Sequence, residues 1–139
     1  MPDSPIEAAW RFQTLESIDR FISSDNVSAQ LSLQNYVSNG FDTSLTANYV
    51  DSINPKTGKS FARVPISSAA QVDHALQAAT DAFKKWSRTT AAFRSSLLQR
   101  VAFLIEENKE LLAVWESIDQ GKTVARARVE VDRAATNFR

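Results

Sequence analysis

The sequence of 139 residues contains no cysteine, a single histidine and only three glycines. The lack of cysteine excludes disulfides, cysteine-based zinc sites and a cysteine nucleophile within these residues. Gly40, Gly58 and Gly121 lie far apart, whereas a phosphate-cradling loop needs several glycines close together, so that backbone N–H groups can approach the anion. The sequence therefore contains neither a dinucleotide-binding fingerprint nor a P-loop.

Net charge and long apolar runs are also missing. Sixteen Lys and Arg residues balance sixteen Asp and Glu residues, so charge does not favour nucleic acid or an anionic membrane as a partner. No window approaches the ~18 unbroken apolar residues of a membrane span. The N-terminal residues lack the pattern of a secretory signal or a transit peptide. We therefore expect a cytoplasmic protein with no nucleic-acid partner and no membrane partner.

Few side chains could carry out catalysis. His74 falls beside Asp73 on the polar side of an expected helix, so a surface position is favoured over a role as metal ligand or general base. Glu106, Glu107 and Glu110 could act as paired carboxylates, but acidic runs of this kind usually form solvated surface. From the residues alone we predict no catalytic residue and no cofactor-binding residue.

Secondary-structure signals change at about residue 30. Residues 4–22 predict a short amphipathic helix that begins at Ser4 and Pro5, and the polar residues that follow indicate a linker. We therefore assign residues 1–30 to an N-terminal extension. Residues 31–65 predict short strands, with one strand over residues 31–37 and turns at Asn39–Gly40 and at residues 54–58.

From residue 67 the apolar spacing changes from two residues to about 3.6, which predicts helices. Ser68 and Gln71 form a capping box, and Thr90 is the expected N-cap of a second helix. Gly121 suits the left-handed position that ends a helix, and a last helix follows it. Short strands followed by three or four helices indicate an α+β domain or one piece of a larger α/β domain.

Four sequence blocks resemble aldehyde dehydrogenases, in the order and at the spacing of that family. The blocks are residues 53–65 (INPKTGK, then ARVP), residues 72–87 (VDHALQAA, then AF and WS), residues 94–106 and residues 116–130 (ESIDQGK, then A, AR and E). Residues 119–123 and 137–139 are most similar to the branch that oxidises 2-aminomuconic or 2-hydroxymuconic semialdehyde. The resemblance covers about residues 32–139 and does not extend to the N-terminal extension.

The resemblance implies an α/β parent fold with a Rossmann-like NAD domain, of which residues 31–139 would be the N-terminal part, truncated after Arg139. In this family a cysteine thiolate attacks an aldehyde or semialdehyde, and a hydride passes to NAD or NADP. A glutamate-activated water then releases the carboxylate. The residues that perform these steps have no counterpart in this sequence. We therefore expect this chain alone to be inactive and to bind neither NAD nor NADP.

The resemblance also carries over one ligand set. Many family members bind a structural monovalent cation through backbone carbonyls just before the Asn-Pro motif and through the aspartate before the Gln-Gly-Lys motif. The matching positions are Ser52, Ile53 and Asp119, and hard oxygen ligands suit such an ion. The alternative is that Asp119 only helps to cap the end of its helix.

Three functional interpretations remain open at this point. In the first, the chain is an N-terminal fragment of an NAD(P)-dependent aldehyde dehydrogenase. In the second, it is a non-catalytic interaction module that associates with a full-length aldehyde dehydrogenase subunit, through apolar helix faces that would otherwise rest on the missing sheet. In the third, it is an independent helical binding domain with coincidental motifs. A structure in which the helices pack only on one another, with no strand cluster against them, would support this third interpretation.

Overall fold

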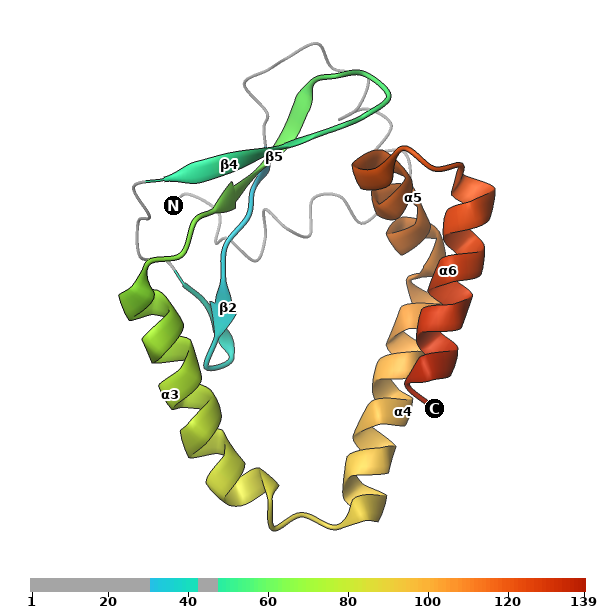
Figure 1. Ribbon diagram of the computed structural model, residues 1–139. Helices are drawn as coiled ribbons and strands as arrows, with labels where there is room; N and C mark the ends of the chain where they lie inside the picture. Colours follow the sequence, from blue (N-terminus) through green and yellow to red (C-terminus); the bar gives the residue numbers. More distant parts are fainter. Residues whose placement is uncertain (1–30, 43–47) are drawn as a thin grey trace, which may run out of the picture.

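The computed structural model describes residues 31–42 and 48–139. Within these ranges, short strands come first and four helices follow (Figure 1), which confirms the predicted order of elements. The amphipathic helix and linker expected within residues 1–30 lie outside the described residues. None of the helices in the described ranges has both the length and the apolar character that crossing a bilayer requires.

A three-stranded sheet lies at one end of the molecule. Its central strand is β5 (Ser60–Pro65), which pairs in parallel with β1 (Leu31–Ser32) and antiparallel with β4 (Tyr49–Ile53). The guanidinium of Arg63 lies 4.5 Å from the centre of the Tyr49 ring, and this cation–π contact adds to the backbone pairing of β4 and β5. β5 ends at Pro65 as the sequence predicts, because proline has no N–H to extend the ladder.

The single strand expected over residues 31–37 is wrong, because the structure divides it into two. β1 ends at Ser32, and Leu33 donates one more backbone hydrogen bond to β5. The side-chain amide of Asn35 then donates to Ser67 Oγ at 2.8 Å. This bond holds the segment after β1 beside Ser67, just before the first described helix. The segment therefore no longer pairs with β5.

A separate hairpin follows, formed by β2 (Tyr36–Val37) and β3 (Gly40–Phe41). The two central residues of its turn are Ser38 and Asn39, with φ angles of 54° and 62°. Two successive positive φ angles are what a type I′ hairpin turn requires. The turn therefore lies one residue before the predicted Asn39–Gly40, because cross-strand pairing takes Gly40 into β3.

Helices α3 (Ala69–Trp86) and α4 (Ala91–Glu107) begin at the caps that the sequence predicts. Ser68 Oγ accepts a hydrogen bond from the backbone N–H of Gln71 at 3.3 Å, and Gln71 Oε1 accepts one from the backbone N–H of Ser68 at 2.9 Å. Thr90 Oγ1 accepts from the backbone N–H of Phe93 at 3.2 Å. Each bond satisfies a donor that the first turn of a helix would otherwise leave unpaired.

The core lies where α5 (Lys109–Gln120) and α6 (Val124–Asn137) pack together with α4. Small buried side chains let these helices approach closely, and Val131 packs among them with Ile105 and Val124 against the cluster. The fully or almost fully buried alanines of this core are Ala102, Ala113, Ala127 and Ala135.

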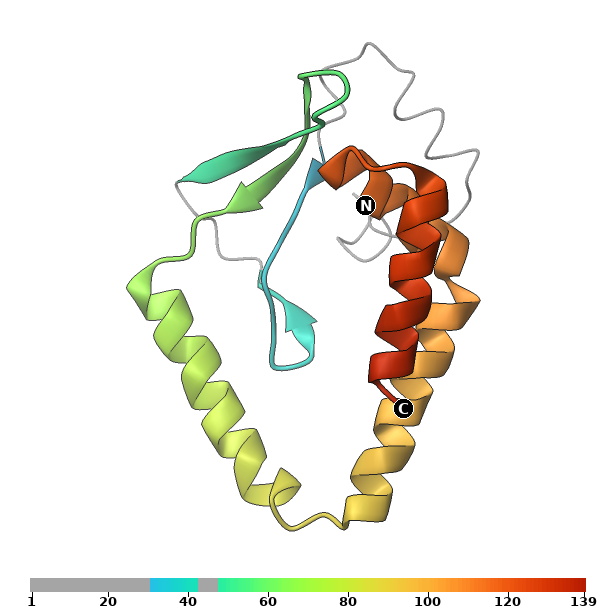
Figure 2. The same cartoon turned by 45° about the vertical axis from the view of Figure 1, so that its right-hand side comes forward.

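Helix α3 forms an arm that is separate from the group of α4, α5 and α6 (Figures 1 and 2). The two arms meet at the turn of residues 87–90, and the sheet lies at the other end of the molecule. No described element packs along the length of α3, and none of its residues is buried. Leu76 is 65% exposed and Phe83 is 61% exposed, so the apolar face of α3 is not part of the core of the described chain.

Candidate cation site at the junction of hairpin and helices

The turn between β4 and β5 is held by a buried asparagine. Asn54 is 7% exposed, and its Oδ1 accepts a hydrogen bond from the backbone N–H of Lys56 at 2.9 Å. Its backbone carbonyl accepts from Gly58 N–H at 2.8 Å, and its own N–H donates to the Lys59 carbonyl at 2.9 Å. These bonds fix the shape of the turn and therefore the position of Pro55.

Pro55 packs directly against Gly121, the residue that ends α5. Gly121 has a φ of 71°, and its N–H donates to the Ser117 carbonyl at 2.9 Å, which confirms the predicted left-handed cap. A Cβ at Gly121 would lie 2.7 Å from Pro55 Cγ. Glycine is therefore required here for two independent reasons, namely the backbone conformation and the contact with the proline ring.

The contact between the β4–β5 turn and the end of α5, here called the junction, also brings together two of the three residues predicted to bind a cation. Ser52 Oγ, from β4, donates to Asp119 Oδ1, in the last turn of α5, at 2.9 Å. Ile53 follows Ser52 directly, at the point where the register of β4 against β5 shifts. Such irregularities re-aim backbone groups at the edge of a sheet.

These oxygen atoms fit a monovalent cation by their chemistry. The Asp119 carboxylate with the neutral backbone carbonyls of Ser52 and Ile53 is a hard ligand set of low charge. In residues 31–42 and 48–139, no group of three histidine, cysteine, aspartate or glutamate side chains could hold a metal ion. At the end of α5 the backbone N–H of Gly121 donates to the Ser117 carbonyl, and the Asp119 carboxylate contacts the sheet through Ser52.

An ion cluster next to the junction ties α5 to α6. Lys122 Nζ lies 2.7 Å from Glu116 Oε1 and also pairs with Glu130, and the Lys122 side chain is only 18% exposed. The hydrogen bonds with Glu116 and Glu130 raise the pKa of Lys122 above its usual value of 10.5. The bond from Lys122 in turn lowers the pKa of Glu130.

Sequence reasoning missed this cluster because its members do not share one helical face. Lys122 is six residues from Glu116 and eight residues from Glu130, with the end of α5 between them. Ion pairs are recognised in sequence by spacings of three or four residues on a single helix. Ser117 Oγ donates to the Lys122 carbonyl at 2.6 Å, so the cluster also holds the turn that contains Gly121.

The other polar residues singled out in the sequence are exposed or form ion pairs on the surface. His74 is exposed on α3. Both carboxylate oxygens of Glu106 accept from Arg139 Nη2 at 2.6 Å, and Glu110 forms a bidentate pair with Arg128. The hydrogen bond from Arg128 lowers the pKa of Glu110. These glutamates therefore belong to surface ion pairs, in agreement with the interpretation favoured by the sequence.

The arrangement of strands, junction and helices recurs in known proteins. The sequence profile of the aldehyde dehydrogenase family matches residues 42–139. This chain belongs to the aldehyde dehydrogenase family. The interpretation as an independent helical domain with coincidental motifs is therefore wrong.

Curated relatives confirm the expected similarity to semialdehyde dehydrogenases. The 2-aminomuconic semialdehyde dehydrogenase of Homo sapiens is 40% identical over 112 residues, which are 80% of this chain and 23% of that protein. Malonate-semialdehyde dehydrogenase 1 of Shouchella clausii is 36% identical over 105 residues, which are 76% of this chain and 21% of that protein. The chain thus spans about a fifth of the length of the relatives that it matches.

Comparison with solved structures confirms the parent fold. The HpcC protein of Thermus thermophilus superposes with a TM-score of 0.75 at 30% identity, covering 90% of this chain and 24% of that one. Betaine aldehyde dehydrogenase of Staphylococcus aureus, solved in complex with NAD+, superposes with a TM-score of 0.70 at 29% identity, covering 78% of this chain and 22% of that one.

Proposed function

We propose that this chain forms the N-terminal part of an NAD(P)-dependent aldehyde dehydrogenase domain that oxidises an aldehyde or semialdehyde to the carboxylate. The family match over residues 42–139 carries this proposal. Two relatives that are named for semialdehydes support a semialdehyde as one candidate substrate class of the whole domain. The S. aureus relative in complex with NAD+ supports a nicotinamide cofactor for the whole domain.

The chain by itself is proposed to be inactive as a dehydrogenase. Covalent aldehyde oxidation needs a thiolate that forms a thiohemiacetal, from which the hydride leaves. The sequence contains no cysteine, so this intermediate has no attachment point. Its three separated glycines also do not supply a backbone loop that could approach the pyrophosphate of the cofactor.

Formation of NADH from NAD+ and a semialdehyde tests this proposal. The purified chain is expected to give no rate above the buffer blank, and the full-length human relative serves as the positive control. Iodoacetamide provides a sharp control, because it alkylates the cysteine of a contaminating host dehydrogenase but finds no thiol in this chain. A saturable rate that survives iodoacetamide would contradict the proposal.

We also propose that Ser52, Ile53 and Asp119 hold a structural monovalent cation. Such an ion would neutralise the Asp119 carboxylate and strengthen the connection between β4 and α5. The test compares urea unfolding midpoints in sodium or potassium chloride with those in tetramethylammonium chloride at equal ionic strength. The midpoint of the wild type should rise with the small cations, and that of Asp119→Asn should not.

A matched variant separates this site from general salt effects. Asp73→Asn removes one exposed carboxylate from α3, so it should keep the full response of the wild type. Equal midpoints of the wild-type chain in all three salts would refute the cation proposal.

The exposed apolar faces of α3 and α4 favour a second function, which is non-catalytic association with an aldehyde dehydrogenase polypeptide. Co-purification of the chain with a tagged full-length family member would support this function. Elution of the chain as a separate monomer from an equimolar mixture would count against it.

A further inference from the structure

Asn39 is the one asparagine of the sequence that a glycine follows. This order matters chemically, because the backbone nitrogen of the next residue can attack the side-chain amide carbon of an asparagine and close a five-membered ring. A glycine favours the attack, since it has no Cβ beside the nitrogen and its backbone reaches conformations that are closed to other residues. The pair Asn39–Gly40 therefore combines an electrophile with an accessible nucleophile.

The hairpin of β2 and β3 exposes this asparagine to water. Ser38 and Asn39 are the central residues of the turn, and both are exposed. The hydroxyl of Tyr36 donates a hydrogen bond to Asn39 Oδ1 at 2.9 Å. This bond draws electron density away from the amide carbon, which makes that carbon more open to attack.

The fold of the hairpin does not require a glycine at position 40. Gly58 and Gly121 have positive φ angles, whereas Gly40 does not. A Cβ at Gly40 would lie 3.9 Å from the Val37 carbonyl oxygen, which is an ordinary van der Waals contact. An alanine at this position should therefore preserve the hairpin and change only its chemistry.

The nitrogen of Gly40 becomes available when the hairpin opens. In the closed hairpin Gly40 is paired with Val37, and Asp42 N–H donates to the Asn35 carbonyl at 2.7 Å. β2 and β3 contain two residues each and pair with no other strand of the described chain. A two-stranded hairpin is only marginally stable in water, and segments of this kind open locally far more often than a core does.

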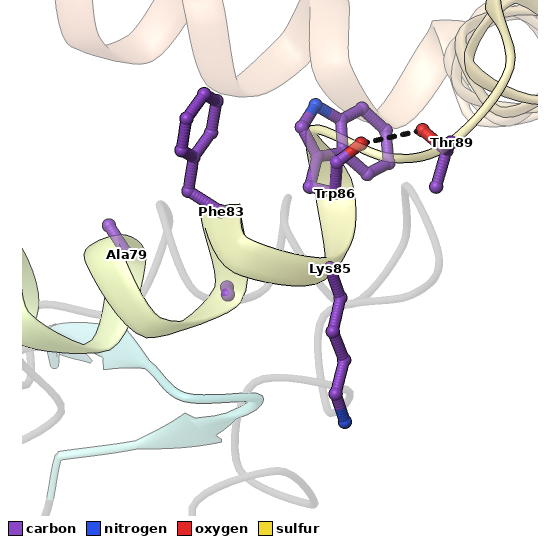
Figure 3. Close-up of a pocket in the computed structure, with 6 residues that line it drawn as sticks. Ala79, Phe83, Lys85, Trp86 and Thr89 are labelled. Atoms are coloured by element: carbon purple, nitrogen blue, oxygen red, sulfur yellow. Dashed lines mark hydrogen bonds between the residues drawn. The ribbon is translucent and has the colours of Figure 1, made fainter.

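The turn between α3 and α4 is a useful comparison. Thr89 Oγ1 donates to the Trp86 carbonyl at 2.7 Å (Figure 3), and Arg94 Nη1 donates to the Thr89 carbonyl at 2.7 Å. These side-chain bonds hold the turn between two long helices, and its residues 87–90 include no asparagine. Of the two turns, the hairpin therefore combines easy opening with a reactive side chain.

Two other asparagines provide internal comparisons. Asn54 is 7% exposed and precedes Pro55, whose nitrogen carries no hydrogen and cannot attack. Asn108 is exposed but precedes Lys109, whose Cβ obstructs the nitrogen. Asn108 Nδ2 also donates to the Leu104 carbonyl at 2.8 Å, which holds the amide against its helix. Exposure alone therefore does not make an asparagine reactive.

We propose that Asn39–Gly40 is a modification site at which asparagine converts spontaneously to isoaspartate. The Gly40 nitrogen forms a bond to Asn39 Cγ, the Cγ–Nδ2 bond breaks, and ammonia leaves with the proton of that nitrogen. Water then opens the resulting succinimide. Attack at Cγ gives aspartate, and attack at the backbone carbonyl carbon gives isoaspartate. Water is the only co-reactant, and nothing is oxidised or reduced.

Isoaspartate would change the hairpin as well as its charge. The main chain then runs through Cβ and Cγ of residue 39, so the turn gains one backbone atom and the molecule gains one carboxylate. A type I′ turn needs two central residues of standard backbone. We therefore expect the edge-to-face contact between Tyr36 and Phe41, now at 5.1 Å between ring centres, to be lost on conversion.

The test follows the purified chain during incubation at neutral pH. Peptide mass spectrometry measures the exchange of the amide for a carboxyl at each asparagine. An isoaspartyl methyltransferase with radiolabelled S-adenosylmethionine then labels isoaspartate but not aspartate. Asn39 should convert, mainly to isoaspartate, while Asn108 in the same sample stays intact. Direct hydrolysis of the amide by water gives aspartate alone, so isoaspartate reports attack by the Gly40 nitrogen.

Two glycine variants and a peptide make the test specific. Gly40→Ala should slow conversion at Asn39 about tenfold, because the added methyl group obstructs the nitrogen and restricts its backbone. Gly58→Ala adds the same methyl group outside the hairpin and should leave the rate at Asn39 unchanged. A peptide of residues 36–41 gives the rate without the fold, and the folded chain should react within about tenfold of it.

Three results would overturn the inference. Asn39 that stays intact in the folded chain while the peptide converts would show that the hairpin protects it. Equal rates in the wild type and Gly40→Ala, or aspartate without isoaspartate, would show that Gly40 is not the nucleophile. These readouts involve neither aldehyde oxidation nor cation binding, so they stand apart from the tests of the proposed function.

Discussion

The contact between Pro55 and Gly121 allows a quantitative prediction for Gly121→Ala. An alanine at a φ of 71° is in the left-handed region, which costs a residue with a Cβ about 1–2 kcal/mol. The added Cβ would also lie 2.7 Å from Pro55 Cγ, and forcing a methyl group into a filled space typically costs about 1–3 kcal/mol. The free energy of unfolding should therefore fall by about 2–5 kcal/mol.

Gly58 and Pro55 provide matched controls. Gly58→Ala introduces the same backbone conformation, with a φ of 69°, but its Cβ would meet no atom within 4 Å. The free energy of unfolding of Gly58→Ala should therefore fall only by the cost of the left-handed backbone, about 1–2 kcal/mol. Pro55→Ala combined with Gly121→Ala removes the crowded ring atoms, so the double variant should lose less stability than the sum of the two single variants.

The measurement is urea unfolding followed by tryptophan fluorescence. Trp115 is a suitable reporter, because its ring stacks on Phe61 with centroids 6.4 Å apart and so joins α5 to β5. Replacing Trp10 and Trp86 with phenylalanine leaves Trp115 as the sole tryptophan of the chain. The shift in the urea midpoint is multiplied by the slope of the free energy of unfolding against urea concentration. The product is the change in the free energy of unfolding.

The reasoning would be refuted by equal destabilisation in Gly121→Ala and Gly58→Ala, since the proline contact would then contribute nothing. It would also be refuted if the effects of Pro55→Ala and Gly121→Ala were simply additive, because the clash would then not involve the proline ring.

Two further predictions concern pH and use matched neutral variants. Hydrogen bonding to Arg128 lowers the pKa of Glu110 in the folded chain. The pair should therefore make its full contribution to the free energy of unfolding above the usual glutamate pKa of 4.5. This contribution should be lost as the pH falls through the lowered pKa of the folded chain. The stability difference between wild type and Glu110→Gln should therefore shrink on acidification below that range, and a constant difference would contradict the assignment. Glu116 and Glu130 raise the pKa of Lys122. The contribution of Lys122 to the free energy of unfolding should therefore be complete below pH 10.5 and disappear as the pH rises through the raised pKa of the folded chain. Comparison of wild type with Lys122→Met by thermal unfolding should show a difference that narrows only at strongly alkaline pH.

Local signals in the sequence were sufficient for three helix ends, namely the starts of α3 and α4 and the end of α5. The capping box at Ser68 and Gln71, the cap at Thr90 and the left-handed Gly121 each depend on residues within one turn of a helix. The hairpin turn was misplaced by one residue because Asn39–Gly40 is a strong local turn signal, whereas the register of β2 against β3 is decided by pairing between strands.

The candidate site could not have been assembled from local signals. Ser52 and Asp119 are 67 residues apart, and only the resemblance to aldehyde dehydrogenases placed them in one ligand set. The contact of Pro55 with Gly121 and the Lys122 cluster were not predicted. The first depends on how the turn between β4 and β5 packs against the end of α5, and the second on how α6 packs there. That packing is a tertiary property that neither helical periodicity nor capping rules encode.

The alanine-rich seam where α4 meets α5 and α6 has a consequence for how these helices can vary. Ala102, Ala113 and Ala127 have no remaining accessible surface, so a larger side chain at any of them would push two helix axes apart rather than fill empty space. New binding preferences in this region can therefore arise on the outward sides of the helices, while the inward sides are confined to the smallest side chains.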